Sequence, residues 1–411
     1  MRRLRVLMSA YGCEPGKGSE PGIGWNVARE MARRHDVWVI TRANNRGAIE
    51  SALAQGPTPG LHFEYYDVPR WASWWKRGSR GVQLYYYLWQ WGIHAVARRL
   101  HREVGFDVAH HVTFVKYWAP SPLARLGVPF LWGPVGGGDS TPRAFLADLS
   151  PASRRYERLR EAARWVGERD PLVRLTARRA GLAVATTPET ATAVTRIGAR
   201  RVELLSQVGF APHEIATAAP VAPRQGAFRV ISMGNLLGLK GYHLGLRAFA
   251  RLGEGASEYW IVGDGPERGN LEREARKLGV SARVRFFGRL PRSEAVARLA
   301  ECDVLLHPSL HDSGGIVCLE ALGAGKPVVC LDLGGPSLIV TAETGCSIAA
   351  RDPAQSVEAM GAALRRLAGD AELRARMGAA GRRRVAEEYN WTRKGEIFDR
   401  MYRELVGEAR S

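Results

Sequence analysis

Short runs of apolar residues alternate with helical patterns along the first two hundred residues of the chain. Residues 5–9 and 36–41 have the pattern of buried strands, and residues 24–33 between them have the pattern of a helix. Further strand candidates follow in the same rhythm at residues 62–66, 108–111, 130–132 and 182–186. Strands that alternate with helices in this way predict a parallel, doubly wound α/β sheet.

A break in this rhythm precedes a second alternating series. Residues 211–226 contain Pro220 and Pro223 and predict a linker between two domains. Beyond the linker, one helical pattern separates each strand candidate from the next, at residues 228–233, 258–262, 283–287, 304–307, 327–331 and 346–348. We therefore predict two Rossmann-like, doubly wound domains that face an interdomain cleft, with the chemistry in the loops that follow the strands.

The composition is that of a globular protein. The chain has 411 residues, of which 45% are hydrophobic and 24% charged, and it has no apolar run long enough to span a membrane. The first ten residues fit a buried strand better than a secretory signal. Five scattered cysteines without metal-site spacing are typical of reduced, buried thiols in the cytoplasm: Cys13, Cys302, Cys318, Cys330 and Cys346.

The net charge of +18 suggests an anionic partner. Nucleic acid, anionic lipid and phosphorylated ligands all fit a basic protein. Nearly all of the excess charge is arginine, so an arginine-rich composition without a specific partner is the alternative.

Residues 307–329 carry the strongest local pattern: a strand, a glycine loop, a short helix, a glycine stop and the next strand. Gly314 and Gly315 let the backbone approach a ligand, and the start of the following helix presents free amides to an anion. Asp312 before the loop and Glu320 within the helix are good acceptors for sugar hydroxyls. The pattern predicts an anion site beside two carboxylates that bind a polyol, and a tight turn with two solvated acids is the alternative.

This segment resembles the signature of the retaining family 4 glycosyltransferases of the GT-B fold (the group 1 glycosyltransferases), in which two acids flank a glycine-rich turn. Asp312 and Glu320 have the family's spacing, although the family usually has Glu at the first position. The resemblance implies that Asp312 binds hydroxyls of a donor sugar and that Glu320 binds ribose hydroxyls. It also implies that the amides of Gly314, Gly315 and Ile316 face the sugar and the diphosphate.

Residues 234–241 resemble the family loop in which an Arg and a Lys clamp the diphosphate and stabilise it as it leaves. Lys240 fits the Lys position, whereas Asn235 stands at the Arg position. A charge-assisted hydrogen bond contributes about 1.5–3 kcal/mol, so we expect the missing Arg to matter unless another cation replaces it. A surface lysine in a turn is the alternative for Lys240 taken alone.

Two further segments resemble parts of the family's nucleotide site. Residues 261–267 contain Gly263 and Gly265 after a strand, and residues 286–291 contain Gly288 where the family cradles the base. We expect the backbone to approach the donor closely at these glycines, and a purely structural turn is the alternative.

The patterns and the resemblance together predict the domain organisation. It comprises an N-terminal acceptor-binding domain (1–212), a linker (213–226), a nucleotide-sugar-binding domain (227–388) and a C-terminal helix that crosses back toward the first domain (389–411). The last helical pattern, around residues 371–411, is long, polar and basic, with Trp391 and Tyr402 as apolar anchors.

The first domain matches the family more loosely. The glycine-rich loop after its first strand contains Gly22 and Gly24, which we expect to face the same diphosphate. A histidine that the family often has is missing near Val135, and His110 and His111, at the end of another strand, are candidate substitutes in catalysis. A structural role is the alternative for this pair.

Residues 70–80 mix tryptophans with cations and contain no acidic residue: Arg70, Trp71, Trp74, Trp75, Lys76, Arg77 and Arg80. This composition suits the headgroup region of an anionic membrane, and it could also stack single-stranded nucleic acid. Residues 85–91 are also aromatic, and a buried helix there with only residues 70–80 exposed is a further reading. We favour docking on a membrane or an acceptor.

The resemblance implies a metal-independent, retaining hexosyltransferase, and we expect no cofactor. It would move a sugar from a nucleotide-diphosphate donor to a glycan or lipid-linked acceptor, in cell-envelope or exopolysaccharide synthesis. We expect it in the cytoplasm, peripheral on the inner face of the membrane, without a nucleic-acid partner. The alternatives are a catalytically inactive nucleotide-sugar- or membrane-binding GT-B protein, suggested by Asn235, Asp312 and the missing histidine, and a nucleic-acid-binding protein.

Overall fold

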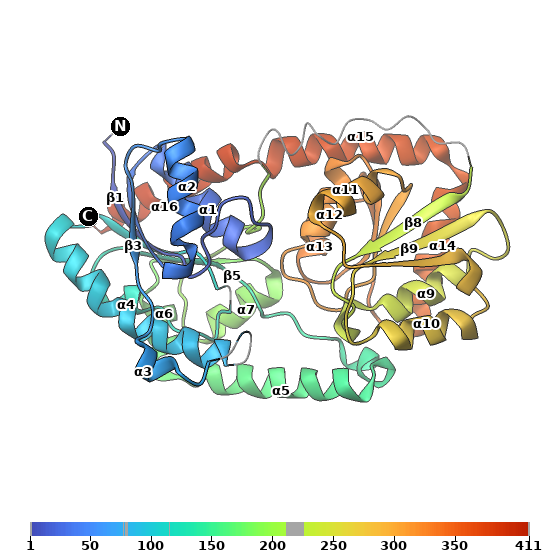
Figure 1. The fold of residues 1–411 in the computed structure, drawn as a ribbon, viewed down its shortest axis with the longest axis horizontal. Coiled ribbons are helices and arrows are strands. Elements are labelled where there is room, and N and C mark those ends of the chain that lie inside the picture. The colour runs from blue at the N-terminus through green and yellow to red at the C-terminus, as the bar shows by residue number, and fades with distance from the viewer. Residues whose placement is uncertain (1, 77, 79–80, 115, 211–225, 410–411) are drawn as a thin grey trace. The chain divides into compact units, whose positions relative to one another are not determined.

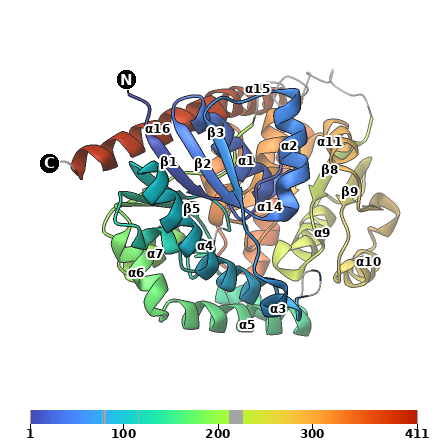
Figure 2. The same cartoon turned by 60° about the vertical axis from the view of Figure 1, so that its left-hand side comes forward.

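The computed structural model describes residues 2–76, 78, 81–114, 116–210 and 226–409. The chain divides into two compact units, each built on one parallel sheet (Figures 1 and 2). The first unit comprises Met1–Gly138, Ala162–Gly209 and Trp391–Ser411, and the second comprises Asp139–Glu161 and Phe210–Asn390.

The first unit contains a 7-stranded sheet in the order β3-β2-β1-β4-β5-β6-β7. Its strands are β1 (Arg5–Ser9), β2 (Asp36–Thr41), β3 (Leu61–Tyr65), β4 (Val108–His111), β5 (Phe130–Val135), β6 (Leu182–Ala185) and β7 (Val202–Leu204). Its helices are α1 (Ser19–Ala32), α2 (Arg46–Gln55), α3 (Arg70–Ser73), α4 (Val82–Val104), α6 (Pro171–Arg179), α7 (Pro188–Arg196) and α16 (Trp391–Glu408). The strand order reverses between β1 and β4, which is the topology of a doubly wound sheet.

The second unit contains a 6-stranded sheet in the order β10-β9-β8-β11-β12-β13. Its strands are β8 (Phe228–Met233), β9 (Ser257–Val262), β10 (Val284–Gly288), β11 (Val304–His307), β12 (Val328–Leu331) and β13 (Gly345–Ile348). Its helices are α9 (Tyr242–Ala250), α10 (Arg268–Lys277), α11 (Arg292–Ala300), α12 (Ile316–Gly323), α13 (Gly334–Ile339), α14 (Pro353–Gly369) and α15 (Ala371–Glu388). The two parallel sheets confirm the predicted α/β fold class.

Residues 139–161, which the sequence placed in the first domain, belong to the second unit. They form a 3-10 turn (Arg143–Asp148) and the first turns of α5 (Pro151–Gly167), a helix that continues into the first unit. Phe145 and Leu149 are buried in the core of the second unit, together with residues of its sheet and helices. This apolar packing explains the assignment, since side chains buried in one core hold their segment in that unit.

The C-terminal pattern around residues 371–411 forms two helices, α15 and α16, that are separated at Tyr389 and Asn390. Helix α16 belongs to the first unit, where Tyr402 is fully buried and contacts His110 of β4. Strand β7 has no counterpart among the strand candidates. The predicted linker at 213–226 lies, except for Gly226, outside the described residues.

The cysteines are free thiols. Four of them are buried and Cys346 is half-buried, as the scattered spacing predicted. Burial raises the pKa of the Cys330 thiol to about 12, so this thiol is protonated at neutral pH.

Candidate functional site

The loop between β11 and α12 is organised by the carboxylate of Asp312. Its Oδ2 accepts a hydrogen bond from Lys240 Nζ at 2.9 Å and lies 3.0 Å from His307 Nε2. Its Oδ1 accepts the backbone amides of Gly314 and Gly315 at 3.1 and 3.0 Å. Burial alone would raise the pKa of this carboxyl, but Lys240, His307 and the Gly315 amide outweigh that effect and hold the pKa well below its usual range. Asp312 is therefore an anion at neutral pH.

These contacts bear on the amides that were expected to face a sugar and a diphosphate. The amides of Gly314 and Gly315 donate to the chain's own carboxylate, so a ligand would have to draw them away from Asp312. Ile316, the third residue expected there, is the first residue of α12. The predicted contact of these amides with a donor stays a prediction.

Lys240 lies in the loop after β8, and its side chain is partly exposed. An ammonium group has three N–H donors, and the bond to Asp312 uses one of them. A Cβ at Gly241 would lie 1.9 Å from the carbonyl oxygen of Pro308, so this glycine lets the Lys240 loop pack directly on the loop after β11. Asn235, in the same loop as Lys240, is exposed.

The predicted donor-binding glycines Gly263, Gly265 and Gly288 lie where the loops after β8, β9 and β10 pack against one another. Gly263 donates its amide to the carbonyl of Gly288 at 2.8 Å, and a Cβ at Gly263 would lie 1.9 Å from the carbonyl oxygen of Gly234. A Cβ at Gly265 would lie 2.6 Å from the carbonyl oxygen of Leu236. The close packing of backbone on backbone explains why glycine stands at these positions, whatever role the glycines also have toward a donor.

Glu320 lies in the second turn of α12. Its Oε1 accepts a hydrogen bond from Nε of Arg292, on α11, at 3.0 Å, and its side chain is largely buried. The second unit thus carries the predicted residues Lys240, Asp312 and Glu320 on the loops and the helix that follow β8 and β11.

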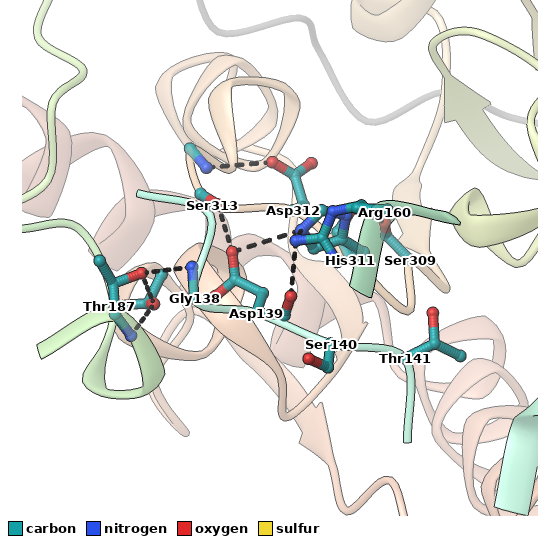
Figure 3. A network of polar contacts seen from close by, with 12 residues as sticks. Gly138, Asp139, Ser140, Thr141, Arg160, Thr187, Ser309, His311, Asp312 and Ser313 are labelled. Carbon is teal, nitrogen blue, oxygen red and sulfur yellow. Dashed lines mark hydrogen bonds and ion pairs between the residues drawn. The ribbon is translucent and has the colours of Figure 1, made fainter. Parts of the chain in front are cut away.

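Beside this loop lies a polar network that the sequence did not predict (Figure 3). The buried carboxylate of Asp139 accepts a hydrogen bond from Ser313, the residue that follows Asp312. Arg160 of α5 donates to the carbonyl oxygen of Asp139 at 2.7 Å, and its Nη2 lies 2.9 Å from His311 Nε2. The segment 139–161 therefore supports the Asp312 loop on both sides of Asp312.

Acidic residues of α5 complete this network. Arg160 lies 3.9 Å from Glu157 and 3.3 Å from Glu161. Thr141 donates to Glu157 at 3.0 Å, and Ser140 donates to Glu161 at 3.1 Å. Glu157 is buried, so its charge depends on these partners.

Gly22 and Gly24 belong to the first unit, where they let the glycine-rich loop pack on α1. A Cβ at Gly22 would lie 1.9 Å from the carbonyl oxygen of Lys17, and one at Gly24 would lie 2.1 Å from that of Gly12. Backbone packing therefore explains both glycines. Their contact with a diphosphate stays a prediction.

His110 and His111 lie at the end of β4 in the first unit, and both are buried. The two ring nitrogens of His110 contact Tyr402 Oη at 2.5 Å and the carbonyl oxygen of Gly133 at 2.6 Å. His111 Nε2 lies 3.5 Å from Tyr86 Oη. Burial lowers the pKa of His110 to about 3 and that of His111 to about 4, so both rings are neutral at neutral pH. These contacts favour the structural alternative for His110, and the catalytic role stays untested.

Within the described residues, no group of three or more His, Cys, Asp or Glu side chains could hold a metal ion. Over the same part of the chain, no helix is long and apolar enough to cross a membrane.

Three residues of this site were not expected from the sequence: His307, Asp139 and Arg160. His307 ends the strand that leads to Asp312, so its position offered a local signal. Asp139 and Arg160 offered none, since they reach the loop from more than 150 residues away in the chain.

The fold is shared with solved glycosyltransferases. The crystal structure of Anabaena HepE in complex with UDP and glucose superposes with a TM-score of 0.61 at 19% identity, over 98% of this chain and all of that one. WaaG, a glycosyltransferase involved in lipopolysaccharide biosynthesis, gives 0.59 at 20% identity, over 95% of this chain and 99% of that one. At such identities the likeness concerns the fold, which is the GT-B architecture of two Rossmann-like domains.

A family-model match lies within the second unit. Residues 217–384 match the family model described as glycosyl transferases group 1, over about two fifths of the chain. It is 34% identical over 223 residues to the lipopolysaccharide core biosynthesis glycosyltransferase LpsD of Rhizobium meliloti, covering 53% of this chain and 63% of that protein. It is 33% identical over 172 residues to a glycogen synthase of Mycobacterium tuberculosis, covering 41% of each. The matches therefore span about two fifths to three fifths of these relatives.

We predict that Gly263→Ala destabilises the second unit. The added Cβ meets the Gly234 carbonyl, and φ at Gly263 is +139°. We expect a loss of at least about 2 kcal/mol in the free energy of unfolding, measured by urea denaturation. Gly279→Ala is the control, because φ is +70° there with no atom within 4 Å of the new Cβ, and strain alone costs about 1 kcal/mol. Equal losses in both variants would contradict the packing argument.

We also predict that Arg160→Ala lowers the free energy of unfolding by about 3 kcal/mol, because it leaves the buried carboxylate of Glu157 without its cation and removes the hydrogen bond to the carbonyl oxygen of Asp139. Arg158→Ala on the exposed side of the same helix is the matched control and should change it by less than about 0.5 kcal/mol. Chemical denaturation of the full chain measures both variants. A small effect in both would show that the network does not support the fold.

Proposed function

We propose that the protein is a glycosyltransferase that moves a sugar from a nucleotide-diphosphate donor to a glycan or lipid-linked acceptor. The observation that carries this proposal is the pairing of Lys240 with Asp312 at the carboxyl ends of β8 and β11, in a unit that matches the group 1 family. The similarity to LpsD supports a role in cell-envelope or exopolysaccharide synthesis. The HepE complex with UDP supports a nucleotide donor.

The reaction follows from the charges at this site. As the bond between the sugar and the diphosphate breaks, negative charge grows on the departing diphosphate, and the remaining N–H donors of Lys240 would stabilise it. The new bond forms between the sugar carbon and the acceptor oxygen, and the acceptor's proton passes to the diphosphate. This route needs neither a metal nor a separate carboxylate base. We propose that the transfer retains the configuration of the sugar, as the resemblance to family 4 implies.

Asp312 and Glu320 would hold the donor. Asp312 is ionised and fixed in place, so it can accept a hydrogen bond from a sugar hydroxyl. Glu320 would accept from the ribose diol after exchanging its contact with Arg292. Asn235 stands where the family has an Arg, and Arg292 is a cation in the same unit. In the structure, Arg292 forms an ion pair with Glu320.

A place in the cytoplasm, on the inner face of the membrane, fits a lipid-linked acceptor. In residues 70–76, Trp71 and Trp74 are 81% and 77% exposed. Trp75 instead donates its Nε1 to the carbonyl of Ala72, and Lys76 lies over the ring of Tyr85. Arg77 and Arg80, also expected at this surface, lie outside the described residues.

The aromatic run 85–91 divides between core and surface. Tyr85, Tyr86 and Trp89 of α4 are buried, while Trp91 is exposed. The buried-helix reading thus holds for most of this run, and the exposed tryptophans of residues 70–76 are the stronger candidates for membrane contact.

An inactive donor-binding protein is the competing proposal, favoured by Asn235 at the Arg position, and turnover with any acceptor separates the two.

A thermal-shift screen of nucleotide sugars tests donor binding, because a ligand at one hundred times its Kd adds about 2.7 kcal/mol of stability. We predict that Glu320→Ala removes most of the shift given by the best donor while the unliganded protein unfolds as the wild type does. Arg292→Ala is the control, since it breaks the same ion pair but leaves the carboxylate. Calorimetry that shows unchanged donor affinity in Glu320→Ala would remove Glu320 from the site.

We predict that Lys240→Ala lowers kcat by roughly 100-fold or more with a smaller effect on donor affinity, because the charge that Lys240 stabilises develops in the transition state. Lys240→Arg keeps a cation beside Asp312 and should retain more of the rate. Lys277→Ala, an exposed residue of α10, should leave both quantities unchanged. Equal losses in binding and in kcat/KM would mean that Lys240 binds the donor without favouring the transition state.

A further inference from the structure

Helix α5 presents an apolar face to solvent along its whole length. Tyr156, Leu159, Trp165 and Val166 are 57%, 64%, 57% and 61% exposed, and Ala162 and Ala163 between them are exposed as well. Leu159, Ala162 and Val166 follow one another at intervals of three and four residues, which places them on one stripe of the helix, with Arg155 four residues before Leu159. Single exposed apolar residues need no explanation, but a continuous apolar stripe does.

Several polar side chains of α5 face inward. Glu157 is buried against Thr141, and Arg160 binds Asp139 and His311, as described above. Arg164 donates to the carbonyl of Gly138 at 2.9 Å. Helix α5 is therefore inverted relative to an ordinary surface helix, which buries its apolar stripe and exposes its polar one.

The charges on the exposed side have one sign. From Pro151 to Arg169, the exposed positions include Arg155, Arg158 and Arg169 and no acidic residue, since Glu157 is buried and Glu161 and Glu168 are half-buried. The Arg169 guanidinium lies 3.7 Å from the centre of the Trp165 ring. An apolar stripe bordered by arginines and an indole is the composition of a helix that lies in the interface of an anionic bilayer.

We propose that α5 is a membrane-docking helix. It lies along the surface of an anionic bilayer, inserts Leu159, Val166 and their apolar neighbours at the level of the headgroups, and places Arg155 and Arg158 among the lipid phosphates. Charge complementarity selects the lipid surface over a second copy of this chain, because two such faces would bring arginines of like charge together. No described helix is apolar enough to span the bilayer, so the contact is peripheral.

This surface is distinct from residues 70–76 and does not depend on sugar transfer. The inward side of the same helix holds the Asp312 loop through Arg160 and Asp139. Docking α5 would therefore place the membrane on the opposite side of the helix from the network in Figure 3.

The test is sedimentation of the full chain with vesicles of phosphatidylcholine alone or mixed equally with phosphatidylglycerol, at low and high salt. One variant reverses charge (Arg155→Glu with Arg158→Glu) and one removes apolar contact (Leu159→Gln with Val166→Gln). The charge control is Arg276→Glu with Lys277→Glu on α10, which changes the net charge equally at exposed positions. The apolar control is Leu204→Gln, at an exposed leucine of β7. Trp71→Ala with Trp74→Ala tests residues 70–76 separately.

We expect the wild type to pellet only with anionic vesicles, and less at high salt. Each α5 variant should lose at least about tenfold in vesicle affinity, while both controls bind like the wild type. The proposal is overturned if the wild type does not bind, if the α5 variants bind as well as their controls, or if only the Trp71 and Trp74 variant loses binding. It is also overturned if the α5 variants change a dimer into a monomer in ultracentrifugation without changing vesicle binding. None of these results depends on whether a sugar is transferred.

Discussion

The carboxylate of Asp312 is the contact on which the arrangement of the candidate site depends. It binds a lysine from the loop after β8, lies beside the histidine that ends β11, and accepts two amides at the start of α12. A largely buried charge is costly unless it is paired and hydrogen-bonded, and here four groups pair it. A single side chain thereby fixes both the shape of the glycine loop and the position of Lys240. The shorter Asp at this position is suited to that task because its oxygen reaches the amides of its own loop.

The glycines around this site let the backbones of neighbouring loops approach each other closely. Gly263 and Gly265 bring the loops after β8 and β9 into backbone contact, and Gly241 does the same for the loops after β8 and β11. A motif of glycines at strand ends is therefore consistent with both packing and ligand binding, because each needs a backbone without a Cβ. At Gly263 and Gly265 the geometry shows the packing cause.

Helix α5 connects the site to a surface. Its arginine and glutamate side chains that face inward are used to hold Asp139 and His311, which flank the Asp312 loop. Since Arg160 and Glu157 are committed to the interior, the outward side is left with alanines, large apolar residues and arginines. The same division of side chains explains a buried polar network and an exposed apolar face on a single helix.

The sequence by itself determined the two α/β sheets, nearly all of their strands, and the placement of Asp312 and Lys240 in the same unit. Short stretches of sequence encode these features, through the alternation of strand and helix, glycines at strand ends and a loop of fixed length. Tertiary structure alone decided that residues 139–161 belong to the second unit, that Asp139 and Arg160 hold the Asp312 loop, and that His110 is enclosed by Tyr402 and Gly133. Asp139 meets Ser313 across 174 residues and His110 meets Tyr402 across 292. The packing of helices and sheets determines which residues so distant in sequence come into contact. No local pattern of burial or turn geometry indicates which segment will cover a given loop.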